Sequence, residues 1–151
     1  MPTIVLGLGN ELLGDEGVGV HAVRLLQREN LPATIRMLEV GTAVLDAVQE
    51  LEGAERVIIL DAMKADGAPG TVYKIPLEDC QGSTCIASMH GFDIFRVMLL
   101  AGSGKIPPVT VFGVEPQRLD WSMELSPPVS LALPALLAAV RLELALPPCS
   151  S

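Results

Sequence analysis

The amino-acid sequence predicts an α/β fold: a three-layer sandwich with a mixed, mostly parallel, twisted sheet of about five strands between helices on both faces. Three observations predict it. Short apolar runs alternate along the chain with longer segments of helical period. Each strand candidate is a continuous apolar run, which is typical of strands buried on both faces. The chain has 151 residues and is 50% hydrophobic, which is enough for one sizeable core.

The first part of the chain predicts two strands, each followed by a helix. Residues 3–8, TIVLGL, are short, apolar and β-branched at their start, as expected of a buried strand. Residues 17–29 place apolar side chains at helical period, so they predict an amphipathic helix. Residues 34–40 predict the second strand. Residues 43–51 predict a short helix, for which Thr42 is the expected N-cap.

The second part of the chain predicts three more strands and two more helices. Residues 56–62, RVIILDA, form the most convincing buried strand. Residues 71–75 follow it after the turn ADGAPG, closely enough to pair with it antiparallel, which makes the sheet mixed. Residues 91–102 predict a helix that ends in glycine, and residues 108–114 predict the last strand. A long apolar helix over residues 128–146 closes the domain.

A single domain of residues 1–146 accounts for the chain, and residues 147–151 are expected to form a disordered tail. Pro134 is expected to kink the last helix or to mark its true start. The net charge of −8 argues against nucleic acid and anionic membranes as partners. We find neither a secretory signal pattern nor an uncharged apolar run of about 18 residues, so we expect a cytoplasmic protein without a membrane span.

The cysteines do not predict a chemical role. Their number is odd and their spacing irregular, which favours neither a disulfide framework nor a zinc site: Cys80, Cys85 and Cys149. None of them stands beside a histidine in a nucleophile motif. We therefore expect reduced thiols that take no part in function.

The loop after the first strand, GLGNELLGDEGVGV at residues 7–20, resembles a phosphate loop at first. Its first two glycines fit the dinucleotide pattern G-x-G-x-x-G, but Leu12 stands at the third. Asp15 and Glu16 stand where a pyrophosphate needs bare backbone N–H groups, and their carboxylates would repel it. Glu39, at the end of the second strand, is where a ribose-binding acid would stand. A nucleotide-binding module is therefore kept as an alternative.

Both acids of this loop also suit the start of a helix. Asp15 can cap the helix that begins near Gly17, and the two negative charges favour the positive end of the helix dipole. On this interpretation Asp15 caps the helix or supports Glu16, and Glu16 is left to face a ligand.

Three residues are candidates for one metal-contacting site. Ligands of such sheets lie beyond the carboxyl ends of the strands, where Glu16 follows the first strand and Asp61 ends the third. His90 stands just before the helix predicted from about Gly91, whose N-terminus keeps the imidazole neutral and able to bind a metal. Two oxygens and one nitrogen suit a divalent ion such as Ni²⁺ or Zn²⁺. His21 lies on the polar face of its helix and is expected to be solvated.

Five segments resemble, in the same order, the motifs of the hydrogenase maturation endopeptidases. They are VLGLGNELLGDEGVGV at 5–20, GTA at 41–43, IILDAMKADGAPGT at 58–71, SMHGFDI at 88–94 and FGVEPQ at 112–117. The resemblance covers nearly the whole chain. It implies an endopeptidase that removes a short C-terminal extension from the nickel-loaded large subunit of a nickel-iron hydrogenase.

The resemblance also implies roles for particular residues. It gives the metal contacts to Glu16, Asp61 and His90, with Glu16 and Asp61 catalytic, and it places substrate contacts at Gly41 and Thr42. The nickel belongs to the substrate, so no tightly bound cofactor is expected, and other divalent ions can substitute for it. The precursor of the large subunit is the implied partner of an enzyme that is compatible with a monomer.

One segment departs from the family pattern. Many relatives have Asp-Gly-Gly-Thr where this chain has Glu39, Val40, Gly41 and Thr42, which puts the role of the acid in doubt. Two chemical routes stay open: the metal polarises the scissile carbonyl and activates water, or a carboxylate such as Asp61 acts as general base, as in an aspartyl protease. A catalytically silent metal-binding protein of the same fold is the other alternative.

Overall fold

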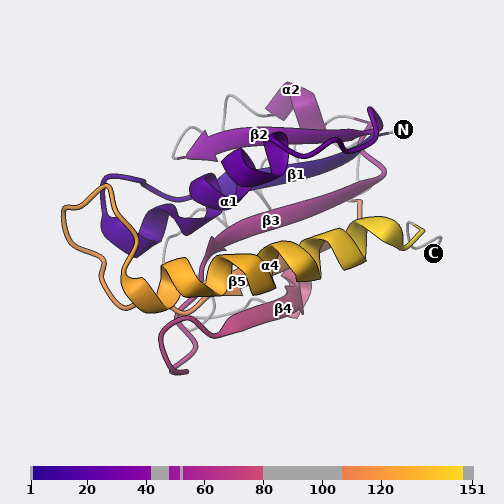
Figure 1. Cartoon of the computed structure of the whole chain (residues 1–151). Helices are drawn as coiled ribbons and strands as arrows, with labels where there is room; N and C mark the ends of the chain where they lie inside the picture. The colour runs from indigo at the N-terminus through magenta and orange to yellow at the C-terminus, as the bar shows by residue number, and fades with distance from the viewer. Residues whose placement is uncertain (1, 42–47, 52, 80–106, 148–151) are drawn as a thin grey trace.

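The computed structural model describes residues 2–41, 48–51, 53–79 and 107–147. Its centre is a five-stranded sheet with strand order β2-β1-β3-β5-β4 (Figure 1). The strands are β1 (Thr3–Leu8), β2 (Ile35–Gly41), β3 (Arg56–Ala62), β4 (Val72–Pro76) and β5 (Val109–Val114). The helices in this part are η1 (Gly14–Gly17), α1 (Val18–Gln27), α2 (Val48–Leu51), η3 (Leu77–Asp79) and α4 (Pro127–Ala145). The predicted α/β fold is confirmed.

The sheet is parallel except at one edge. β1 pairs with β2 and β3, and β3 pairs with β5, all in parallel, whereas β4 runs antiparallel to β5. The predicted partner of β4 was wrong, because β5 lies between β3 and β4. The burial of the two strands explains the order. β5 is almost wholly buried, whereas β4 carries the exposed residues Lys74 and Pro76, which are tolerated only at an edge.

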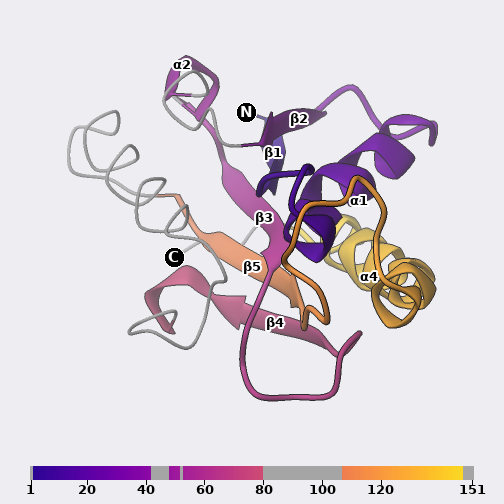
Figure 2. The same cartoon turned by 90° about the vertical axis from the view of Figure 1, so that its left-hand side faces the viewer.

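Helices cover both faces of the sheet, as predicted (Figure 2). α1 and α4 pack on one face, where Val5, Ile58 and Phe112 of the sheet are fully buried. α2 and η3 contribute Leu51 and Leu77 to the core of the other face. The close approach of α1 requires a glycine: a Cβ on Gly19 would lie 2.0 Å from the carbonyl oxygen of Leu60.

α4 agrees with the apolar helix predicted over residues 128–146 to within one residue at each end. It begins at Pro127, directly after the buried Ser126, so Pro134 lies inside the helix and does not start it. By length and composition alone, its 19 residues could cross a membrane, and it is the one such helix in the described ranges. One side of α4 nevertheless packs into the core through Val129, Leu136 and Val140, as the helix of a sheet layer does.

Several predicted features lie outside the described residues. They are the helix over 91–102, the first part of the helix over 43–51, residues 148–151 of the tail, and Cys80, Cys85 and Cys149.

Candidate active site

The candidate site lies where the parallel strands β1, β2, β3 and β5 end. At this end of the sheet, the loop that follows β5 lies beside η1 and the start of α1 (Figure 1). The two segments are bonded to each other: the N–H of Gly14 donates to the carbonyl of Ser122 at 2.7 Å, and the N–H of Asp15 donates to the carbonyl of Arg118 at 2.8 Å. The loop that carries Glu16 is therefore part of a fixed framework.

Asp61 is the most deeply placed acid of the predicted set. It is the penultimate residue of β3 and only 2% exposed. Its Oδ1 accepts a hydrogen bond of 2.7 Å from the N–H of Ala62, and the side chain has further contacts. Asp61 is therefore buried, whereas Glu16 is half-buried.

Gly9 brings Asp61 and Glu16 together. A Cβ on Gly9 would lie 1.9 Å from the carbonyl oxygen of Glu16 and 3.0 Å from Oδ1 of Asp61. Gly9 also has φ +104°, a conformation that side chains rarely adopt. The carboxylate of Glu16 accepts a hydrogen bond of 3.3 Å from the N–H of Asn10, the residue that follows Gly9. Two of the three predicted site residues thus lie against Gly9, Glu16 through its backbone and Asp61 through its carboxylate.

The role of the loop glycines differs from the one expected. Gly7 and Gly9 fit the first two positions of a dinucleotide-binding loop, but at Gly9 the space of the missing side chain is occupied by the protein's own Glu16 and Asp61. Gly17 is similar, since a Cβ there would lie 2.5 Å from Cα of Glu11. These glycines let the loop fold tightly around its own acids.

Asp15 does not cap a helix, so the capping role is wrong, whereas support of Glu16 by Asp15 stays a prediction. Neither η1 nor α1 has a side-chain cap, and Asp15 is only 1% exposed. Its Oδ2 accepts hydrogen bonds of 2.8 Å from the N–H groups of Gln117 and Arg118. Its carboxylate also accepts from the N–H and the hydroxyl of Ser126, both at 2.7 Å. Asp15 therefore ties the loop after β5 to the loop that carries Glu16.

Glu39, the residue that departs from the family pattern, pairs with Arg24 of α1. Nε of Arg24 donates to Glu39 at 2.5 Å, and the two terminal nitrogens donate to the carboxylate of Glu11 at 2.7 and 3.1 Å. The hydrogen bond from Arg24 lowers the pKa of Glu11, and its bonds to Glu11 and Glu39 raise the pKa of Arg24. Arg24 thus links the end of β2 to the loop after β1.

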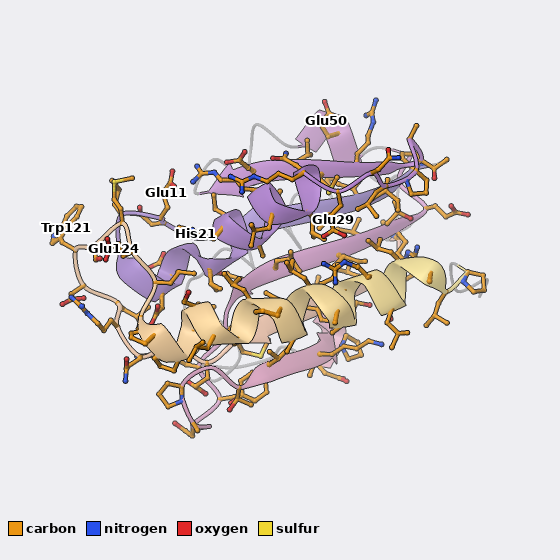
Figure 3. The ribbon with its side chains drawn as sticks, viewed as in Figure 1. Glu11, His21, Glu29, Glu50, Trp121 and Glu124 are labelled. Atoms are coloured by element: carbon orange, nitrogen blue, oxygen red, sulfur yellow. The ribbon has the colours of Figure 1, made fainter. Side chains whose placement is uncertain are left out.

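His21 is not solvated as expected. It lies on α1 beside the loop that carries Glu11 (Figure 3), and its Nε2 is buried without a hydrogen-bond partner among the described residues. Burial lowers the pKa of His21, and the nearby positive charge of Arg24 lowers it further, against the opposing effect of Glu11. The polar face of α1 was correctly predicted, but this part of it is covered.

Glu115 borders the candidate site and was not among the site residues predicted from the sequence. It follows β5 and is buried, and its Oε1 accepts hydrogen bonds from the N–H groups of Ala65 and Gly67 and from the hydroxyl of Tyr73. Burial raises the pKa of Glu115, but the hydrogen bonds, with that from Ala65 the strongest, bring it below its ordinary value. The acid within FGVEPQ, directly after a buried strand, was the available signal.

The remaining predicted site residues are only partly placed. Gly41 ends β2 with φ +59°, and its carbonyl accepts a hydrogen bond from the N–H of Gly9 at 3.1 Å, so it borders the site. Thr42 and His90 lie outside the described residues. In the part of the chain that the structure describes, no group of three His, Cys, Asp or Glu gathers to hold a metal. The three-residue metal site stays a prediction.

The fold and the site together define a class: an α/β protein with a carboxylate pair built around a glycine loop at the carboxyl edge of its sheet. A family model described as hydrogenase maturation protease matches residues 20–142. The chain belongs to the hydrogenase maturation protease family and is a peptidase. The predicted family is confirmed, and it takes precedence over a nucleotide-binding module and a silent metal-binding protein.

Individual relatives agree with this assignment. The Hydrogenase 2 maturation protease of Escherichia coli is 35% identical over 150 residues, which cover 93% of this chain and 92% of that protein. The hydrogenase expression/formation protein HoxM of Azotobacter vinelandii is 36% identical over 147 residues, which cover 91% and 70%. The solved structure of the hydrogenase maturating endopeptidase HybD from E. coli superposes with a TM-score of 0.84 at 30% identity, covering 95% of this chain and 92% of that one.

Proposed function

We propose that this chain cleaves the precursor of a nickel-iron hydrogenase large subunit, removing a short C-terminal extension after nickel has been inserted. The observation that carries the proposal is the loop around Gly9, at the carboxyl ends of the parallel strands. There the backbone of Glu16 and the carboxylate of Asp61 both approach Gly9, and the carboxylate of Glu16 accepts a hydrogen bond from the N–H of Asn10. Two carboxylates at the same end of the sheet can contact a cation that a substrate presents there. On this proposal the cation is the nickel ion that the precursor presents.

The two carboxylates differ in a way that suits different roles. Glu16 is half-buried, so its carboxylate can reach an ion delivered from outside. Asp61 is 2% exposed and held by the N–H of Ala62, so its orientation is fixed before substrate arrives. We assign Glu16 and Asp61 to nickel contact, with His90 as the third ligand that the family resemblance implies.

Hydrolysis requires water to attack the scissile carbonyl while a proton passes to the leaving amine. Nickel bound between the substrate and these acids can polarise the carbonyl, which stabilises the negative charge that develops on its oxygen. A carboxylate such as Asp61 can accept the proton of the attacking water. Both contributions fit one site, and the experiment below separates a nickel ion of the substrate from one owned by the enzyme.

The test is a two-by-two experiment with purified precursor, either loaded with nickel or free of it, each with and without chelator. The new C-terminus is read by mass spectrometry. If nickel belongs to the substrate, loaded precursor is cut in both conditions and nickel-free precursor stays intact even with excess enzyme. Cleavage of nickel-free precursor would overturn nickel recognition, and loss of cleavage on chelation would mean that the enzyme owns its metal.

A further inference from the structure

Three large apolar side chains lie in water beside the candidate site. Trp121 is 76% exposed, Met123 62% and Leu12 43%. We call these three residues the loop-tip patch. In Figure 3, Trp121 points away from the body of the molecule, at the end where Glu11 and Glu124 also lie. Exposed aromatic and Met side chains that come together on a surface are typical of protein interfaces.

The patch comes from two segments that are joined through their backbones. The N–H of Ser122, which stands between Trp121 and Met123, donates to the carbonyl of Leu12 at 3.0 Å. The carbonyl of the same Ser122 accepts from the N–H of Gly14 at 2.7 Å. Leu12 therefore stands next to the two other members of the patch, although more than a hundred residues separate them in the sequence.

The loop that carries Trp121 is anchored on both sides of its tip. Asp15 accepts hydrogen bonds from the N–H groups of Gln117 and Arg118 before the tip and from Ser126 after it. A side chain on an anchored loop loses little freedom when a partner covers it, so more of the burial energy is left for affinity. The patch therefore has the preorganisation expected of a docking site.

The patch is continuous with the candidate site. The N–H of Leu12 donates to the side-chain carbonyl of Asn10 at 2.9 Å, and the N–H of Asn10 donates to the carboxylate of Glu16 at 3.3 Å. A peptidase of this family acts on a protein, which has to lie over the edge of the sheet to bring a peptide bond to Glu16 and Asp61. A folded substrate in that position covers the loop-tip patch as well.

The charges around the patch narrow the chemistry of its occupant. Glu11, Asp120 and Glu124 stand next to its three members in the sequence, and the chain has a net charge of −8. Glu11 pairs with Arg24 at 2.7 Å and Asp120 pairs with Arg118 at 3.1 Å, so the negative character of this end comes from Glu124 and from the net charge of the chain. A partner surface that complements the patch is thus apolar at its centre, with basic side chains around it.

We propose that the loop-tip patch is the docking site for the folded part of the precursor, at a distance from the bond that is cut. This inference rests on the proposed function and adds a second contact area to it. It makes Trp121 a binding residue, whose loss weakens capture of the precursor and leaves the chemical step unchanged.

The first test compares two variants that each remove one exposed apolar side chain. Trp121→Ala removes the centre of the patch. Leu142→Ala is the matched control, since Leu142 is also largely exposed but lies on α4, near the end that Arg56 contacts through Glu143 and Leu146. With nickel-loaded precursor, Trp121→Ala is expected to raise KM roughly 30-fold, the equivalent of about 2 kcal/mol, with kcat unchanged. Leu142→Ala is expected to change neither constant.

The second test reads binding without cleavage. Trp121 is the single tryptophan of the chain, so 5-fluorotryptophan labels this position alone. Excess nickel-loaded precursor, itself unlabelled, is expected to shift and broaden the fluorine resonance of the wild-type enzyme. An unchanged resonance together with a wild-type KM for Trp121→Ala would overturn the docking site. A shift on concentrating the enzyme alone, with a dimer in sedimentation, would assign the patch to a second copy and would also overturn it.

The two proposals fail in different ways. If wild-type enzyme does not cut nickel-loaded precursor, the proposed function fails, and the fluorine titration still decides whether the precursor docks. If cleavage is normal and Trp121 responds neither by KM nor by its resonance, the proposed function stands and the docking site fails.

Discussion

Asp15 and Ser126, which stand 111 positions apart, are joined by two hydrogen bonds of 2.7 Å, from the N–H and the hydroxyl of Ser126 to the two carboxylate oxygens of Asp15. The contact fixes the residue before α4 against the loop that carries Glu16. It is buried, so water cannot replace it. The candidate site therefore depends on a clamp between two segments that are distant in the sequence.

Asp15→Asn is expected to destabilise the fold by about 2–4 kcal/mol, because an amide has one acceptor oxygen and turns N–H groups toward the donors of Gln117, Arg118 or Ser126. Urea unfolding of both proteins measures the difference. Glu124→Gln, an exposed change in the same loop, is the control and should stay within about 0.5 kcal/mol of wild type. Equal free energies of unfolding for Asp15→Asn and wild type would show that the hydrogen bonds of Asp15 do not stabilise the fold.

Glu16→Gln and Asp61→Asn are each expected to lower the processing rate of nickel-loaded precursor by about 100-fold or more, because each removes a carboxylate beside Gly9. The buried Asp61 also accepts the N–H of Ala62, so Asp61→Asn should cost about 1–2 kcal/mol of stability, unlike Glu16→Gln.

Rates for these variants should be measured well below their unfolding temperatures, so that a lost fold is not mistaken for lost chemistry. Glu55→Gln is the control, because Glu55 is an exposed carboxylate directly before β3. It therefore lies at the opposite end of the strands from the site. A wild-type rate in both Glu16→Gln and Asp61→Asn would remove the carboxylate pair from the mechanism.

The sequence predicted the strands and the position of the site better than it predicted the partners of side chains. β1 and β3 match the predicted ranges 3–8 and 56–62, because a continuous apolar run between turns is a local signal. Parallel strands alone predict that Glu16 and Asp61 lie at the same end of the sheet, because the carboxyl ends of such strands meet there. The position of β5 between β3 and β4 does not follow from the sequence. The loop lengths allow β4 to pair with either β3 or β5, and the burial of the strands across the whole sheet decides between them.

Side-chain partners were missed for the same reason. The capping role predicted for Asp15 used only the next few residues of the chain, whereas its partners lie 102 to 111 positions away. The polar face of α1 predicted a solvated His21, but its Nε2 is buried. Periodicity shows which face is polar, and only the tertiary structure shows what covers that face.

Arg24→Ala is expected to lower processing several-fold, because Arg24 holds both Glu11 in the loop after β1 and Glu39 at the end of β2. The stability cost should be small, about 1 kcal/mol or less, since the pairs are partly exposed. The matched control is Arg36→Ala, which removes the Arg36–Glu50 pair and leaves the site alone. If both variants lower processing equally, the effect comes from net charge and not from the position of the loop.

The pH dependence of stability should carry a contribution from His21. Burial, with Arg24 next in effect, lowers the pKa of His21 in the folded state below its ordinary value of 6.5. Below about pH 6.5 the unfolded chain therefore binds a proton that the folded chain resists, and stability falls as the pH drops toward the folded pKa. Above about pH 6.5 both states hold a neutral ring, so His21 no longer lowers the free energy of unfolding.

His21→Gln is expected to flatten the fall in the free energy of unfolding between about pH 7 and pH 5.5, because glutamine at this position does not take up a proton. Urea unfolding at half-unit steps of pH measures the two slopes, and their difference reports His21, since His90 is present in both proteins. Glu11, whose pKa is lowered chiefly by its hydrogen bond to Arg24, loses its stabilising effect only below its unfolded value of 4.5, so it does not disturb this window. Parallel curves for wild type and His21→Gln from pH 7 to 5.5 would mean that the imidazole is protonated as readily in the folded chain as in the unfolded one.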